Sequence, residues 1–165
     1  MRSITQARVR ELFDYDPHRG VLVWRVNRRG RFARIGNVAG SVGRYVVVAV
    51  DCKHYPAHCL IWLWCHGVYP DELDHRNRNK HDNRIGNLRV CSRSQNTGNV
   101  GLRSTNLTGY KGIWFANHAG RWRAAIKING RSKHLGYFET PESAALAYNA
   151  AALEYFGEFA HLNDV

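Results

Sequence analysis

A change of composition at residues 98–108 constrains this 165-residue chain most, because it separates two stretches that each need a core of their own. The segment GNVGLRSTNLT is rich in Gly, Asn, Ser and Thr and poor in large apolar side chains, which is typical of a linker. Both flanking stretches are long enough to fold as small domains. We therefore predict an N-terminal domain at residues 1–97, a linker at residues 98–108 and a C-terminal domain at residues 109–163.

The periodicity of the first stretch indicates a mixture of helices and strands. Thr5 is placed to cap a first helix, and Asn87 to cap a last one. The apolar run HCLIWLWCHG favours a buried helix, although its length also fits a strand. The predicted elements are a helix at 5–13, strands at 21–26 and 45–50 with a short strand after a turn at 51–53, a buried helix at 57–66 and a helix at 88–96.

The second stretch has three strand patterns followed by one helix pattern. Asn129-Gly130 is a strong hairpin signal between the second and third strands. Thr140 and Pro141 begin a helix rich in small residues, and Gly157 ends it. We predict a three-stranded antiparallel sheet packed on this helix, and an α+β class for the whole chain. The predicted strands cover residues 110–116, 120–130 and 131–138.

The balance of charge is strongly basic, with 24 Lys and Arg against 13 Asp and Glu and a formal net charge of +11. This excess favours nucleic acid as a partner, because each neutralised phosphate releases counterions, although a basic enzyme of another class has the same balance. No apolar run approaches the roughly 20 residues that span a bilayer, and no signal peptide pattern is present. The cysteines form no C-x-x-C pair, so we expect reduced thiols in a cytoplasmic protein and no structural zinc.

The polar stretch DELDHRNRNKHDNRIGNLRVCSRSQN follows soon after the apolar run. Such polarity is typical of a solvated loop, but the stretch also holds the parts of a hydrolytic site. The Asp74 carboxylate and the Asn96 amide oxygen suit a hard divalent cation such as Mg²⁺, and a histidine can take a proton from water. Nearby cations can hold a phosphodiester backbone. These cations are Arg76, Arg78, Lys80, Arg84, Arg89 and Arg93.

The order of these residues resembles the HNH endonucleases, and in particular the branch common among bacteriophage and homing enzymes. The pattern runs H-x-x-x-W-x-x-x-H-G…P…L-D-H-x-N-x-N-x-x-D-N-R-x-x-N-L-R, from His58 to Arg89. The resemblance covers roughly residues 10–100. It implies a ββα-metal module at about residues 57–97, in which two short strands form a hairpin and a helix follows.

The same resemblance implies a role for each residue of the motif. His75 is the implied general base, and Asp74 is an implied metal ligand. Asn87 is the central asparagine that orients the His75 ring and the hairpin. Asn96 stands where many relatives have a histidine and is the implied second ligand of a divalent metal, with Mg²⁺ expected and Mn²⁺ as the alternative. The implied products are a 5′-phosphate and a 3′-hydroxyl.

Residues 109–163 resemble the plant apetala-two or ethylene-response-factor DNA-binding domain. The resemblance rests on YKGI at 110–113, G-x-W-x-A-x-I at 120–126, L-G-x-F at 135–138 and E-x-A-A-x-A-Y at 142–148. In that family the three-stranded sheet lies in the major groove and the helix packs behind it, which a B-DNA groove permits.

The middle strand of this domain alternates apolar and basic side chains, so one face should pack on the helix and the other should be wet. We expect Trp122, Ala124 and Ile126 on the helix side. The expected DNA-facing residues of the domain are Lys111, Trp114, Arg121, Arg123, Lys127, Arg131 and Lys133.

The sequence thus predicts a metal-dependent HNH DNA endonuclease that is positioned on double-stranded DNA by its C-terminal sheet. One active site per chain favours a monomer that nicks, while double-strand cleavage would need a dimer or two visits. The alternative is a non-cleaving, sequence-specific DNA-binding regulator with an inactive nuclease module. The intact set of His75, Asp74, Asn87 and Asn96 favours the enzyme.

Overall fold

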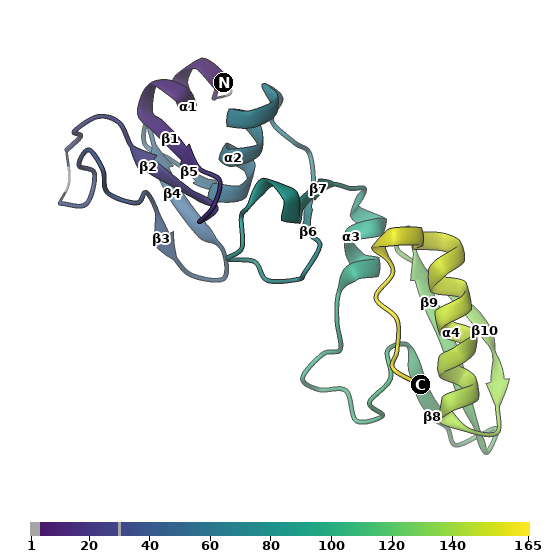
Figure 1. The fold of residues 1–165 in the computed structure, drawn as a ribbon. Helices are drawn as coiled ribbons and strands as arrows, with labels where there is room; N and C mark the ends of the chain where they lie inside the picture. The colour runs from purple at the N-terminus through teal and green to yellow at the C-terminus, as the bar shows by residue number, and fades with distance from the viewer. Residues whose placement is uncertain (1–3, 30) are drawn as a thin grey trace. The chain divides into compact units, whose positions relative to one another are not determined.

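The computed structural model describes residues 4–29 and 31–165 and has a mixed α/β fold with small antiparallel sheets (Figure 1). Residues 1–3 and Gly30, which the sequence assigned to the N-terminal domain, lie outside the described residues. In the part of the chain that the structure describes, no helix has both the length and the apolar character needed to cross a membrane. The chain divides into two compact units.

The N-terminal unit, Met1–Val90, is built around small antiparallel sheets. Strand β1 pairs with β2, β4 lies between β3 and β5, and β6 pairs with β7. In chain order its elements are α1 (Gln6–Leu12), β1 (Phe13–Asp16), β2 (Val21–Trp24), β3 (Ser41–Val42), β4 (Val46–Val50), β5 (Lys53–Pro56), α2 (Ala57–His66), β6 (Leu73–His75), a 3₁₀ turn (Ile85–Asn87) and β7 (Leu88–Val90).

Helix α2 supplies the apolar centre of this unit, because its side chains are apolar over most of its surface. Leu60 and Ile61 are fully buried. Strands β1 and β2 add Phe13 and Trp24, whose ring centroids lie 4.4 Å apart in the same cluster. Gly67 ends the helix with a φ of 79°, a conformation that glycine adopts without steric cost. The predicted buried helix is confirmed.

The structure overturns the predicted helix at residues 88–96. The first part of that range is strand β7, and helix α3 (Arg93–Asn99) begins only after it. Ser92 caps α3: its hydroxyl accepts from Gln95 N, and Gln95 Oε1 accepts from Ser92 N. This capping box satisfies two backbone N–H groups at once, which a lone Asn87 cap does not.

The C-terminal unit, Cys91–Val165, begins before the predicted linker, because α3 packs against α4. A Cβ placed on Gly98 would lie 2.6 Å from Phe156 Cγ, so the helix approaches α4 closely. Lys111 Nζ donates to Gly98 O at 2.7 Å. The start of the predicted linker is therefore folded structure. The other elements are β8 (Ile113–Ala116), β9 (Arg121–Ile128), β10 (Arg131–Phe138), α4 (Pro141–Phe156) and a 3₁₀ turn (Gly157–Phe159).

The sheet of this unit has the antiparallel order β10-β9-β8. Ala124 and Ile126 of β9 lie in one buried cluster with Ala144 and Tyr148 of α4. The three predicted strands are present, and Thr140 caps α4 by accepting from Ser143 N, as its sequence indicates. One face of the sheet is thereby left to solvent.

Candidate active site

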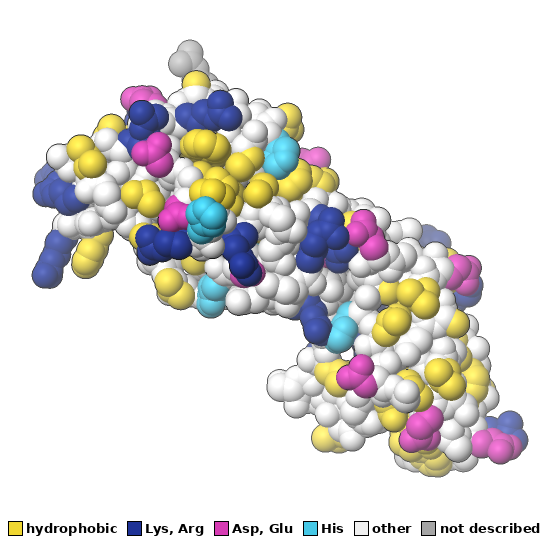
Figure 2. Space-filling view, viewed as in Figure 1, with side chains coloured by type: hydrophobic (Ala, Val, Ile, Leu, Met, Phe, Trp, Pro, Cys, Tyr) yellow, Lys and Arg dark blue, Asp and Glu magenta, His cyan; other side chains and the backbone are white. Residues whose placement is uncertain are grey.

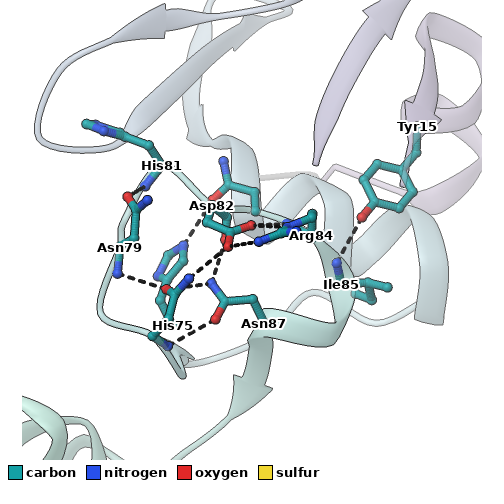
Figure 3. A network of polar contacts seen from close by, with 10 residues as sticks. Tyr15, His75, Asn79, His81, Asp82, Arg84, Ile85 and Asn87 are labelled. Carbon is teal, nitrogen blue, oxygen red and sulfur yellow. Dashed lines mark hydrogen bonds and ion pairs between the residues drawn. The ribbon is translucent and has the colours of Figure 1, made fainter. Parts of the chain in front are cut away.

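His75 is the last residue of strand β6, and a side-chain amide holds its ring. The residue is 5% exposed. Its Nε2 atom lies 3.0 Å from Asn83 Oδ1 (Figure 3). An amide oxygen only accepts hydrogen bonds, so Nε2 carries the hydrogen of the neutral ring and Nδ1 is the nitrogen that can accept a proton. His75 is thus oriented as a base.

Two aromatic rings flank His75 inside the unit. The ring centroid of His58 lies 5.0 Å away and that of Tyr45 lies 6.4 Å away. His58 is buried, and its Nδ1 atom has no hydrogen-bond partner among the described residues. Burial, and to a smaller extent the neighbouring His75, lowers the pKa of His58 to about 4. His58 is therefore neutral at pH 7 and adds no positive charge beside the candidate base.

Asp74 precedes His75 and is buried in an ion pair with Arg89. The guanidinium Nε donates to Asp74 Oδ2 at 2.9 Å, and Nη2 lies 2.8 Å from the same oxygen. The two residues are direct partners in the β6–β7 register, which brings their side chains to one face of the hairpin. A buried carboxylate needs such a partner, and here the partner fixes its orientation. The sequence placed Arg89 among the DNA contacts, but its burial points to an internal role.

Asn87 braces the loop that joins β6 to the 3₁₀ turn. Its Oδ1 accepts from Asn77 N at 3.0 Å, while its Nδ2 donates to Asn77 Oδ1 at 2.9 Å and to Asp82 O at 2.7 Å (Figure 3). Asn77 Oδ1 also accepts from Asn79 N at 2.9 Å. Side-chain amides thus supply the bonds that strand pairing supplies elsewhere, which explains why this loop is rich in asparagine.

The far end of the loop is anchored to the turn between β1 and β2. Arg84 donates from Nε and Nη2 to the Asp82 carboxylate at 2.7 and 2.6 Å, and these bonds are the main cause that lowers the pKa of Asp82 to about 2. Tyr15 Oη accepts from Ile85 N at 2.9 Å. Gly20 has a φ of +66°, and a Cβ there would lie 2.5 Å from Arg84 N. A glycine in this turn therefore lets it close onto the loop.

The remaining cations predicted to hold DNA in this unit lie on the outside of the loop. Arg76 and Arg78 are exposed, and Arg84 is exposed despite its pairing. Lys80 Nζ lies 5.0 Å from the Tyr45 ring centroid. Figure 2 shows Lys and Arg side chains on the surface of the molecule, with Asp and Glu side chains among them.

The two predicted metal ligands come from different units. Asp74 belongs to the N-terminal unit, whereas Asn96 is a half-buried residue of α3 in the C-terminal unit. Among the described residues, no three His, Cys, Asp or Glu side chains form a group that could hold a metal ion. The donor set in question is one carboxylate and one amide, which fits a hard divalent cation that keeps most of its water and does not fit zinc.

The solvent face of the C-terminal sheet combines cations with aromatic rings. Trp114 and Arg123 are register partners, and Arg123 Cζ lies 5.1 Å from the Trp114 ring centroid. Arg123 Nε donates to His134 Nδ1 at 3.2 Å. The His134 ring lies 4.8 Å from that of Tyr137, centroid to centroid. These four side chains form a contiguous surface that we call the sheet cluster.

The other predicted cations of this sheet divide between its two faces. Arg121 and Lys127 are exposed and alternate with the buried residues of β9, which places them on the face of the sheet cluster. The register instead places Arg131 and Lys133 opposite isoleucines of the buried cluster. Lys133 Nζ also donates to Tyr155 Oη of α4. These two cations therefore lie on the helix side.

Two more predicted contacts lie near helix α3. Lys111 is half-buried, and its ammonium group is bonded to the carbonyl of Gly98 and lies 5.9 Å from the Tyr148 ring centroid. Arg93 is exposed at the first position of the helix. Lys111 thus stabilises the unit from within, while Arg93 is available at the surface.

Three of these contributors have no direct signal in the sequence. Asn83 was not among the predicted site residues, and it accepts the bond from His75 only because the loop folds back over β6. Arg89 looked like a surface cation until strand pairing set it opposite Asp74. His134 lies in β10, and only the register with β9 brings it to Arg123. A prediction that paired β6 with β7 would have found Arg89.

Residues 55–97 match the family model for HNH endonucleases. These residues form an HNH segment. The chain is 36% identical over 121 residues to an uncharacterized HNH endonuclease of Acanthamoeba polyphaga mimivirus, a match that covers 72% of this chain and 62% of the relative. It is 25% identical over 105 residues to Protein 3.8 of Escherichia phage T7, covering 62% of this chain and 86% of that protein.

A second set of relatives matches a shorter part of the chain. APETALA2-like protein 2 of Oryza sativa subsp. japonica is 39% identical over 54 residues, which is 33% of this chain and 12% of the relative. The chain thus joins an HNH segment to an APETALA2-like segment, and it spans less than two thirds of the viral relative and a small part of the plant one. No solved structure matches significantly.

Proposed function

We propose that this chain is a metal-dependent endonuclease whose HNH segment hydrolyses phosphodiester bonds in duplex DNA. The observation that carries the proposal is the buried His75 ring, whose Nε2–H is held by Asn83 Oδ1 at 3.0 Å. This bond fixes both the tautomer and the direction of the ring, which is what a general base requires. The HNH match of residues 55–97 supports the same conclusion.

In this proposal His75 Nδ1 takes a proton from a water molecule as the water oxygen attacks phosphorus. The new P–O bond forms as the bond to the 3′-oxygen breaks. The departing 3′-oxygen takes a proton from solvent water, which leaves a 5′-phosphate and a 3′-hydroxyl. Asn83 keeps the ring in the correct tautomer. The hydrogen bonds donated by the Asn87 side-chain amide hold the loop that carries Asn83 in place. His58 stays neutral, so it places no positive charge beside His75 that would disfavour uptake of the proton.

Asp74 and Asn96 would hold the divalent cation, with Mg²⁺ preferred and Mn²⁺ as an alternative. When bound, this cation would stabilise the negative charge that develops on the phosphate and on the leaving oxygen. Arg89 would keep the Asp74 carboxylate in one orientation. Its role is then to position a ligand, because the residue is only 7% exposed.

The C-terminal sheet would position the enzyme on duplex DNA. The proposed contact surface is the sheet cluster together with Arg121 and Lys127, which share its face. Cations there would bind phosphates, and the aromatic rings beside a guanidinium would provide planar surfaces for contacts in a groove. The APETALA2-like match supports this use of the sheet. We further propose a monomer that nicks.

A nicking assay separates the enzyme from the alternative, a DNA-binding regulator with an inactive nuclease module. Wild-type protein with Mg²⁺ or Mn²⁺ should relax supercoiled plasmid, and His75→Ala should do so at least about 10²-fold more slowly while binding DNA equally well. If both proteins shift duplex DNA and neither relaxes the plasmid, the chain is the regulator.

A further inference from the structure

A cavity of about 530 Å³ opens in the C-terminal unit between helix α3 and the turn that joins β9 to β10. Three segments each bring one cation to it: Arg93 from the start of α3, Arg103 from the segment before β8, and Lys127 from the end of β9. The hydroxyl groups of Ser94 and Thr97 also line it. None of its lining residues is acidic.

The fold itself does not neutralise these three cations. Within residues 4–29 and 31–165, no side chain is ion-paired with Arg93, Arg103 or Lys127. Other cations of the molecule have such partners, since Arg8 pairs with Asp51 and Arg84 with Asp82. Like charges around one cavity repel each other, and an anion bound there would convert that repulsion into attraction.

The walls of this cavity are held in place by contacts independent of any ligand. Ser94 Oγ accepts from Asn129 N at 3.2 Å, which fastens α3 to the β9–β10 turn. Asn129 itself has a φ of 49°, as the Asn-Gly turn requires. One turn further along the helix, Gly98 packs against Phe156. The cavity is thus part of the folded unit. The Ser94 hydroxyl accepts a bond there and can still donate its hydrogen to an oxygen atom, whereas the Thr97 hydroxyl donates to Arg93 O at 2.9 Å.

We propose that this cavity binds a phosphate of the DNA backbone. The proposal rests on the proposed function, in which the chain binds duplex DNA. Lys127 belongs both to the cavity and to the DNA-facing side of β9, so the phosphate site continues the proposed contact surface. Asn96 lies on α3 together with Arg93, so a phosphate held here fixes the helix that carries a proposed metal ligand relative to the DNA backbone.

The test uses the full chain carrying His75→Ala, so that DNA stays intact, and measures duplex affinity by fluorescence anisotropy over a range of salt concentrations. Arg103→Ala and Lys127→Ala should each weaken binding up to about 10-fold and reduce the slope of log K against log salt by up to about 0.9, the value for one phosphate. Because both cations hold the same phosphate, the double variant should lose less than the sum of the two. Arg19→Ala, which removes an exposed cation of the N-terminal unit, is the matched control.

The proposal is overturned if the two variants behave like Arg19→Ala, or if their losses add fully, because additive losses mean two separate phosphates. Inorganic phosphate provides an arm that does not depend on DNA. It should raise the unfolding temperature of the His75→Ala chain more than that of the Arg103→Ala, Lys127→Ala chain. A protein that binds no duplex but retains this difference would refute the proposed function and leave the anion site standing.

Discussion

The β6–β7 loop and the C-terminal sheet both hold polar side chains beside a core, but they do so by different means. In the sheet, backbone pairing of β8, β9 and β10 sets the position of each side chain. In the loop, the side-chain amides of Asn77, Asn83 and Asn87 take over that task. A side-chain substitution in the loop therefore changes the geometry of the site. A substitution on the solvent face of the sheet changes only the surface that it presents, and the sheet itself is disturbed only where its backbone or its buried packing is disturbed.

Asn87→Ala tests the loop half of this comparison and should have the largest effect. It removes three hydrogen bonds at once and releases the segment that carries Asn83. We expect single-turnover cleavage to fall by about 10²-fold or more, since misplacing a catalytic group by about 1 Å is enough for such a loss. Duplex affinity should not change. Asn27→Ala, whose side chain accepts one bond from Ile35 N, is the control and should cleave normally.

Gly112→Ala tests the sheet half. Gly112 has a φ of +76°, and a Cβ there would lie 2.5 Å from both Ala125 O and Tyr148 Cε2. We expect the C-terminal unit to lose about 3 kcal/mol and duplex binding to weaken as it unfolds. Gly109→Ala has the same φ but open space around the new methyl group, so it should cost only about 1 kcal/mol. If urea denaturation gives equal losses of unfolding free energy for the two variants, the close contact of the new methyl group with Ala125 O and Tyr148 has no effect on stability.

The stability of the N-terminal unit should depend on pH through His58. Burial lowers its folded pKa to about 4, below the 6.5 of the unfolded chain, so the folded state binds fewer protons between these values. The stability that depends on a neutral His58 is therefore fully present above pH 6.5 and is lost as the pH falls toward 4. Between pH 7 and pH 5 the loss should be about 2 kcal/mol.

His58→Phe should remove this pH-dependent loss from chemical denaturation curves at pH 7 and pH 5. The C-terminal unit provides the contrast, because burial raises the pKa of its core residue Tyr148 to about 12, far from this range. If the wild type and His58→Phe lose stability equally on acidification, His58 is protonated in the folded state and the explanation from burial fails.

The sequence predicted most of what periodicity and capping residues determine. The buried α2, the three strands of the C-terminal sheet and the Thr140 cap follow from local patterns. The helix predicted at residues 88–96 was wrong, because strand pairing with β6 and the capping box at Ser92 prevailed over the single signal of Asn87. A local pattern does not reveal that residues 88–90 pair with another strand, and without that pairing the later helix start at Ser92 is not favoured over the earlier one at Asn87.

The candidate site followed from its motif, but its supporting contacts did not. Asp74 and His75 could be named from residue types and order alone. The bonds from Arg89 to Asp74 and from His75 to Asn83 depend on tertiary contacts across the hairpin, so no spacing in the sequence reveals them. The contact between Arg123 and His134, which lie on neighbouring strands of the sheet, could not be predicted for the same reason.

The most direct test of the account is the pH dependence of single-turnover DNA cleavage by wild type, Asn83→Asp and Asn83→Leu. Asn83→Asp keeps an acceptor for Nε2 and adds a negative charge that stabilises the protonated ring, so the acidic limb of its profile should move to higher pH. Asn83→Leu removes the acceptor and should cleave about 10²-fold more slowly at every pH. Profiles of all three proteins that coincide with wild type in rate and in acidic limb would contradict the assignment of His75, oriented by Asn83, as the general base.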